Sequence, residues 1–170
     1  MPDLEAALKT AITCEQGIRD LYTQAATESS DAVGKRIFTL LAEDEQSHVD
    51  YLEHQLRQWQ AGGRITLTDF KATPVDRERV AKELVRLSAS LQGDDRGVEQ
   101  QMLSKALAME IETSGLYARL VGDFDEEAKA LFERFLEIEN GHVDVVQAQL
   151  DHLSQTGYWL GYKEFGLEGE

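Results

Sequence analysis

Two segments of this chain carry the same pair of potential metal ligands. Glu45 precedes His48 by three residues, and Glu139 precedes His142 by three. On an α-helix, residues three apart lie one turn above each other on the same face. Each pair can therefore present a carboxylate oxygen and an imidazole nitrogen toward one point, which is a geometry suited to binding a metal ion.

The two pairs belong to an internal repeat that covers residues 38–59 and 132–153. A shift of 94 positions superimposes Glu139 on Glu45 and His142 on His48, together with several apolar neighbours. The preceding segments repeat with a shift of 95 positions. Each half has a glutamate followed seven residues later by a tyrosine, and the equivalent residues are Glu15 with Glu110 and Tyr22 with Tyr117.

Four long helices must position these residues. Apolar side chains recur every three or four residues, and prolines occur only at positions 2 and 74, so long helices are permitted. We expect a first helix from Leu4 to the serines near residue 29, and a second helix that follows it and ends at about Gln60. A third helix is expected from Asp94 to about residue 121, and a fourth follows it and ends at about Gln155. Val98 is expected near the inner face of the third of these helices.

The predicted fold is an all-α four-helix bundle formed by residues 1–155. Residues 61–93 form a long crossover between the second and third long helices, with a short helix that begins near Pro74. Residues 156–170 form a glycine-rich, aromatic tail that we expect to pack on the bundle.

The candidate ligands lie on the apolar faces of these helices. An unpaired carboxylate there costs several kcal/mol, whereas two divalent cations balance four carboxylates. The pattern therefore predicts a binuclear metal site, and its six ligands are Glu15, Glu45, His48, Glu110, Glu139 and His142. The alternative is a metal-free bundle that acts as an interaction module and uses these residues in buried hydrogen bonds.

Other polar residues of the repeat have two interpretations. Tyr22 and Tyr117 either bond a ligand carboxylate beside the site or serve as core aromatic residues. Asp50 and Asp144 lie two residues past the histidines, where the helix points away, so a solvated position is favoured over contact with an imidazole. The same interpretation holds for the two glutamates that precede the ligand glutamates by two residues, Glu43 and Glu137.

Composition excludes several classes of function. The formal net charge of −15 disfavours binding to nucleic acids and to anionic membrane surfaces. One cysteine, Cys14, cannot form an intrachain disulfide or a four-cysteine metal centre. No run of apolar residues is long enough to span a membrane. We expect a cytoplasmic, soluble protein.

With these motifs in place, the chain resembles the ferritin-like superfamily, and most closely the rubrerythrin family, over roughly residues 3–60 and 94–155. The resemblance implies that the six residues bind two iron ions, with Glu45 and either Glu110 or Glu139 as bridging ligands. Two features differ from the family pattern. The chain lacks the four cysteines of a rubredoxin-like iron centre, and Thr113 stands where the family tends to carry a further glutamate.

The resemblance further implies a di-iron oxidoreductase that reduces hydrogen peroxide or O2 with electrons from Fe(II). Without its own rubredoxin-like domain, the protein would need an external donor such as a rubredoxin-like protein. We expect a homodimer. Manganese is an alternative metal, and ferroxidase activity with iron storage is an alternative function, which assembly into a large shell would indicate.

Overall fold

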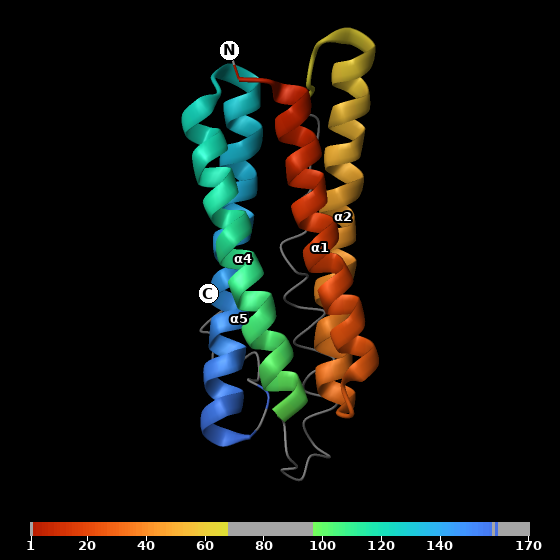
Figure 1. The fold of residues 1–170 in the computed structure, drawn as a ribbon, viewed down its shortest axis with the longest axis vertical. Coiled ribbons are helices and arrows are strands. Elements are labelled where there is room, and N and C mark those ends of the chain that lie inside the picture. The colour runs from red at the N-terminus through yellow and green to blue at the C-terminus, as the bar shows by residue number, and fades with distance from the viewer. Residues whose placement is uncertain (1, 68–96, 158, 160–170) are drawn as a thin grey trace, which may run out of the picture.

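Four helices make up most of the structure, a computed structural model that describes residues 2–67, 97–157 and 159. They are α1 (Leu4–Glu28), α2 (Ala32–Gly62), α4 (Gly97–Asp123) and α5 (Glu126–Thr156) (Figure 1). The described ranges contain no strand, so the predicted all-α class is confirmed. The predicted short helix near Pro74 and most of the crossover lie outside the described residues.

Local sequence signals explain where these helices begin and end. The side chains of Asp3 and Asp31 accept backbone N–H groups from the first turns of α1 and α2. Gly63 and Gly157 end α2 and α5 in the left-handed region, with φ of 63° and 74°. These two glycines are also 94 positions apart, so the internal repeat extends through the ends of both helices.

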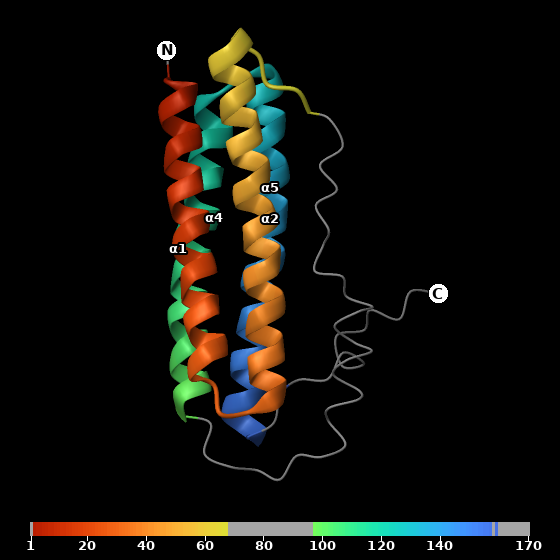
Figure 2. The same cartoon turned by 90° about the vertical axis from the view of Figure 1, so that its right-hand side faces the viewer.

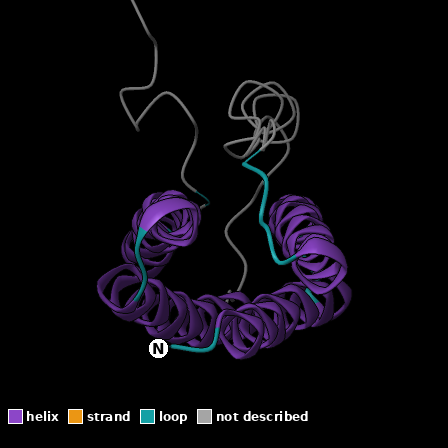
Figure 3. Ribbon diagram, turned by 90° about the horizontal axis from the view of Figure 1, so that it is seen from above, coloured by secondary structure: helices purple, strands orange, loops and turns teal. Residues whose placement is uncertain are grey.

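The helices form two hairpins, in which α1 packs on α2 and α4 packs on α5. Contacts between α1 and α4 join the hairpins. All four helices run along the long axis of the molecule (Figure 2). Viewed along this axis, they are arranged around a common interior (Figure 3). Among the described helices, none contains an apolar stretch of the length that a membrane span requires.

Two apolar clusters fill this interior, one toward each end of the bundle. The first contains Tyr22 and Phe38, and the second contains Tyr117 and Phe132. Each helix contributes side chains to both clusters. Along each helix, the predicted metal ligands come between the residues of the first cluster and those of the second. The polar residues therefore lie between two apolar layers.

The start of α4 differs from the prediction. Val98, which we expected near the inner face, is 47% exposed, whereas Glu99 is buried. The Glu99 carboxylate accepts hydrogen bonds from Ser29 Oγ (2.8 Å) and from the backbone N–H of Ser30 (3.2 Å). These bonds attach α4 to the turn between α1 and α2, and they explain why the carboxylate rather than the valine is inside.

Trp159 is the described residue of the tail beyond Gly157. Its ring is 7% exposed and meets Phe38 edge to face, with ring centroids 5.6 Å apart. It also lies against Gly34 of α2, where an added Cβ atom would be 2.6 Å from Trp159 Cζ2. This close approach requires a glycine at position 34.

Candidate metal centre

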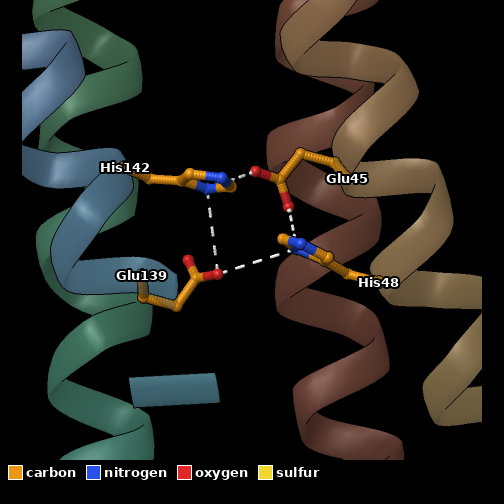
Figure 4. Close-up of side chains that lie close together, drawn as sticks. All are labelled: Glu45, His48, Glu139 and His142. Atoms are coloured by element: carbon orange, nitrogen blue, oxygen red, sulfur yellow. Dashed lines mark hydrogen bonds and ion pairs between the residues drawn. The ribbon is translucent and has the colours of Figure 1, made fainter. Parts of the chain in front are cut away.

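The structure brings the six predicted ligands together inside the bundle. Each of them is at most 4% exposed. Helix α1 contributes Glu15 and α4 contributes Glu110, whereas α2 and α5 each contribute a Glu-x-x-His pair. The four residues from α2 and α5 point toward one another across the interior (Figure 4). The three-residue spacing thus places each Glu and His on the same inward face, as predicted.

Three carboxylates lie around the Nδ1 atom of His48. Its Nδ1 atom is 3.0 Å from Glu45 Oε2 and 3.3 Å from Glu15 Oε2. The same nitrogen is 3.7 Å from Glu139 Oε1 on the facing helix (Figure 4). His48 therefore faces one glutamate from each of α1, α2 and α5.

The surroundings of His142 mirror this arrangement. Its Nδ1 atom is 2.8 Å from Glu45 Oε1, 3.7 Å from Glu110 Oε2 and 3.9 Å from Glu139 Oε1. Glu45 and Glu139 each approach both imidazoles, whereas Glu15 lies beside His48 and Glu110 lies beside His142. Glu45 and Glu139 thus lie between the two histidines.

The two tyrosines of the repeat form hydrogen bonds with the lone glutamates. Tyr22 Oη donates a hydrogen bond of 2.5 Å to Glu110 Oε1, and Tyr117 Oη donates one to Glu15 Oε1. Both tyrosines are fully buried. Each tyrosine comes from one hairpin and holds the glutamate of the other, so the bonds join the two hairpins at the site.

Burial and mutual repulsion separate the pKa values of the carboxyl groups. Burial raises the pKa of Glu15 to about 7, against the opposing effect of its hydrogen bond with His48. Burial also raises the pKa of Glu139 well above its ordinary value, and the nearby charges of Glu15 and Glu45 add to the rise. These two carboxyl groups therefore retain protons more strongly than ordinary glutamates do.

The opposite shift occurs at Glu45. Burial alone would raise its pKa, but the charges of His142 and His48 outweigh that effect and lower it. Burial likewise opposes the charged form of His48, yet Glu45 and Glu15 raise the pKa of this imidazole to about 10. The carboxylates thus create a strong preference for positive charge at the centre of the cluster.

Several buried atoms of the cluster accept no hydrogen bond from the described residues. They are Glu110 Oε2 and both carboxylate oxygens of Glu139. Leaving such acceptors unsatisfied costs free energy, which bound cations would recover. Glu45, His48, Glu139 and His142 also offer ligand atoms that all lie within 4.8 Å of one another. A donor set of four carboxylates and two imidazoles fits two ions of iron or manganese.

Comparison with known protein families agrees with this chemistry. The model of the family described as Rubrerythrin matches residues 6–150, which is most of the chain. The protein belongs to the rubrerythrin family. Its bundle is the ferritin-like di-iron domain of that family, as the resemblance implied. No curated protein and no solved structure matches the chain.

One buried residue beside the rubrerythrin cluster was not predicted from the sequence. Asp44 is 7% exposed, and its Oδ2 atom accepts a hydrogen bond of 2.9 Å from Nε2 of His142. The available signal was its position four residues before His48, which places Asp44 on the inner face of α2. By contrast, Asp50 and Asp144 are exposed, as are Glu43 and Glu137, in agreement with the prediction.

Thr113, the residue at which the chain departs from the rubrerythrin pattern, is 3% exposed. It lies on α4 one turn after Glu110. A hydroxyl group there adds no negative charge, so the described cluster keeps four glutamates rather than five.

Proposed function

We propose that this protein is a di-iron carboxylate oxidoreductase that reduces hydrogen peroxide or O2 with electrons from an external donor such as a rubredoxin-like protein. The observation that carries the proposal is the buried cluster of four carboxylates and two imidazoles, several of whose oxygens accept no hydrogen bond from the described residues. When bound, two Fe(II) ions would supply one electron each, and they would have vacant coordination positions at which the oxidant could bind.

The chain would hold the two ions in two half-sites. Glu15 and His48 would bind one ion, and Glu110 and His142 the other, because each glutamate lies beside the histidine named with it. Glu45 and Glu139 approach both histidines and would be shared. The negative charges of all four glutamates would balance two divalent cations, which would stabilise this arrangement inside an apolar core.

The tyrosines would fix the orientation of the two unshared glutamates. In each case the phenol holds Oε1 of the carboxylate, which leaves Oε2 directed to the nearby imidazole. Hydrogen bonds of this kind around a metal ligand set its rotamer and influence its affinity for the ion. Phe135 packs edge to face on His48, with centroids 5.7 Å apart, and helps to exclude water from this side of the cluster.

Anaerobic titration with Fe(II) tests the proposal directly. We expect two ions per chain, and we expect one equivalent of hydrogen peroxide to oxidise both, because its reduction to two waters consumes two electrons and two protons. Glu45→Ala and Glu139→Ala should abolish binding of the pair, since each removes a shared ligand. Two ions bound by both variants would contradict the proposal.

Matched controls come from exposed carboxylates of the same helices. Asp50→Asn and Asp144→Asn alter α2 and α5 outside the cluster, so both should retain two ions per chain.

We further propose that the protein is a cytoplasmic homodimer. The mass of the protein in solution tests whether it is a dimer. A large hollow shell that accumulates oxidised iron would instead indicate iron storage.

A further inference from the structure

We infer that Trp159 is a positioning residue for one of the two ion positions, the one formed by Glu110 and His142. It acts through two aromatic rings, those of Phe38 and Tyr22. This inference rests on the proposed binuclear site, and it extends the support of that site to the tail beyond α5.

An unbroken series of contacts connects Trp159 with a ligand carboxylate. The indole ring meets the ring of Phe38 edge to face, with centroids 5.6 Å apart. Phe38 stacks on Tyr22, with centroids 6.3 Å apart and an angle of 29° between the rings. The hydroxyl group of Tyr22 donates a hydrogen bond of 2.5 Å to Glu110 Oε1. The position of the indole ring therefore influences the orientation of the carboxylate.

Dense packing makes this series of contacts rigid. The side chains of Phe38 and Tyr22 are fully buried, and Trp159 is nearly so. Gly34, one turn before Phe38 on α2, lets the indole approach this helix so closely that an added Cβ atom would lie 2.6 Å from Trp159 Cζ2. Protein interiors are close-packed, so the loss of a large ring leaves a cavity into which its neighbours can shift. Removing the indole therefore frees Phe38, and with it Tyr22, to move.

The hydrogen bond from Tyr22 fixes the orientation of Glu110. Oε1 of this carboxylate accepts from the phenol, and Oε2 lies 3.7 Å from Nδ1 of His142, beside the proposed ion. A hydrogen bond weakens steeply when its donor moves or tilts. Removal of such a partner usually weakens metal binding by about 10- to 100-fold. Loss of Trp159 disturbs the bond without deleting it, so we expect an effect near the lower limit of this range.

The tyrosine of the other hairpin has separate support. Tyr117 packs on Phe132, with centroids 6.3 Å apart, and it also stacks on Phe135, with centroids 5.1 Å apart. Phe124, in the turn between α4 and α5, packs in turn on Phe132, with centroids 5.4 Å apart. These rings belong to the second apolar cluster, whereas Trp159 belongs to the first. Trp159 therefore supports one of the two tyrosines and not the other.

Variants with one remaining ion position test the inference in the full chain. Glu15→Gln should keep the position of Glu110, and Glu110→Gln should keep the position of Glu15. Each metal-free variant is titrated with Co(II), whose visible absorption reports its ligands. Trp159→Ala should weaken Co(II) binding by about tenfold in the Glu15→Gln background, and by less than about twofold in the Glu110→Gln background. Trp159→Phe keeps a ring against Phe38 and should restore most of the affinity.

A double-variant cycle tests whether Trp159 acts through Tyr22. Tyr22→Phe removes the hydroxyl group and keeps the ring, so it should weaken Co(II) binding in the Glu15→Gln background by about 10- to 100-fold. Adding Trp159→Ala should then cause little further loss, because the hydrogen bond that the indole supports is already absent. Losses that simply add would overturn the inference.

Two further measurements separate positioning from a general loss of stability. Ile65→Ala changes the repeat equivalent of Trp159, in the second apolar cluster, and should leave Co(II) binding at the Glu110 position unchanged. In the metal-free protein, NMR should show the hydroxyl proton of Tyr22 protected from exchange with water, and Trp159→Ala should speed its exchange while the hydroxyl proton of Tyr117 stays protected.

The outcomes distinguish this inference from the proposed function. Equal weakening by Trp159→Ala in both backgrounds, or no weakening in either, would overturn the inference while the binuclear site stands. If the wild-type protein binds neither Co(II) nor Fe(II), the proposed function itself fails, and the inference fails with it.

Discussion

The two hairpins present the same set of candidate ligands but differ in the residues that support them. Both supply a lone glutamate, a Glu-x-x-His pair and a tyrosine that reaches across to the other hairpin. Only the α1–α2 hairpin adds a buried carboxylate next to its ligand glutamate, Asp44, where α5 has Ile138. Similar ligands in different surroundings can bind with different strength, which makes the supporting residues the informative part of the repeat.

The two ends of the bundle show a second difference of this kind. Trp159 and Ile65 occupy equivalent positions, each two residues after the glycine that ends a helix. Trp159 packs in the first apolar cluster against Gly34, whereas the smaller Ile65 belongs to the second cluster, which also contains Ala128, the repeat equivalent of Gly34. A larger aromatic residue at one end is thus accommodated by a smaller residue on the neighbouring helix.

Replacing one lone glutamate at a time should have the largest effect on metal binding, because each replacement removes a ligand from only one of the two proposed ion positions. Glu15→Gln and Glu110→Gln each replace a charged ligand by a neutral amide, so each variant should bind one Co(II) ion per chain instead of two. Loss of the same step in both variants would contradict the assignment of one glutamate to each ion.

The packing of Trp159 should give the largest difference in stability between the two ends. Trp159→Ala should lower the free energy of unfolding by about 3 kcal/mol, since it removes a large buried ring. Ile65→Ala should cost less, because Ile65 is smaller and only partly buried. Chemical denaturation of the metal-free variants measures both values, and equal losses would argue against an asymmetric core.

Gly34→Ala sharpens this comparison because its effect should change sign with the residue at position 159. In the wild type the new Cβ atom would lie 2.6 Å from Trp159 Cζ2, and we expect destabilisation by about 1–3 kcal/mol. In the Trp159→Ala background that clash is absent, and alanine in a helix is favoured over glycine by about 1 kcal/mol. A destabilising effect of the same size in both backgrounds would exclude contact with Trp159 as its cause.

The pH dependence of metal binding should show the smallest of these effects. Because burial raises the pKa of Glu15 to about 7, this carboxyl group is protonated below pH 7 and must release a proton to bind a cation. Affinity should therefore fall as the pH decreases through 7, and it should continue to rise above pH 7 because His48, whose pKa is raised to about 10, must also lose a proton to bind a cation. Calorimetry near pH 6 in buffers of different ionisation enthalpy counts the protons released, and Glu15→Gln should release about one fewer.

Much of this architecture could be predicted from the sequence because helices and their faces follow from local periodicity. Three- and four-residue spacing predicted the four long helices, and the repeat predicted two matching sets of candidate ligands, whose six side chains the structure brings together. The errors arose where a tertiary contact decides which side chain is buried. Val98 was expected inside, but Ser29 and Ser30, about seventy residues away in the sequence, bond the carboxylate of Glu99 and favour its burial instead.

Residue types and spacing alone determined that each half of the chain presents one lone glutamate and one Glu-x-x-His pair on apolar helix faces, because an α-helix repeats every 3.6 residues. Only the tertiary structure decided which side chains meet across the interior. It placed Glu45 and Glu139 near both histidines, directed each tyrosine to the glutamate of the opposite hairpin, and brought Asp44 to His142. These contacts depend on how two hairpins pack against each other, which no local pattern specifies.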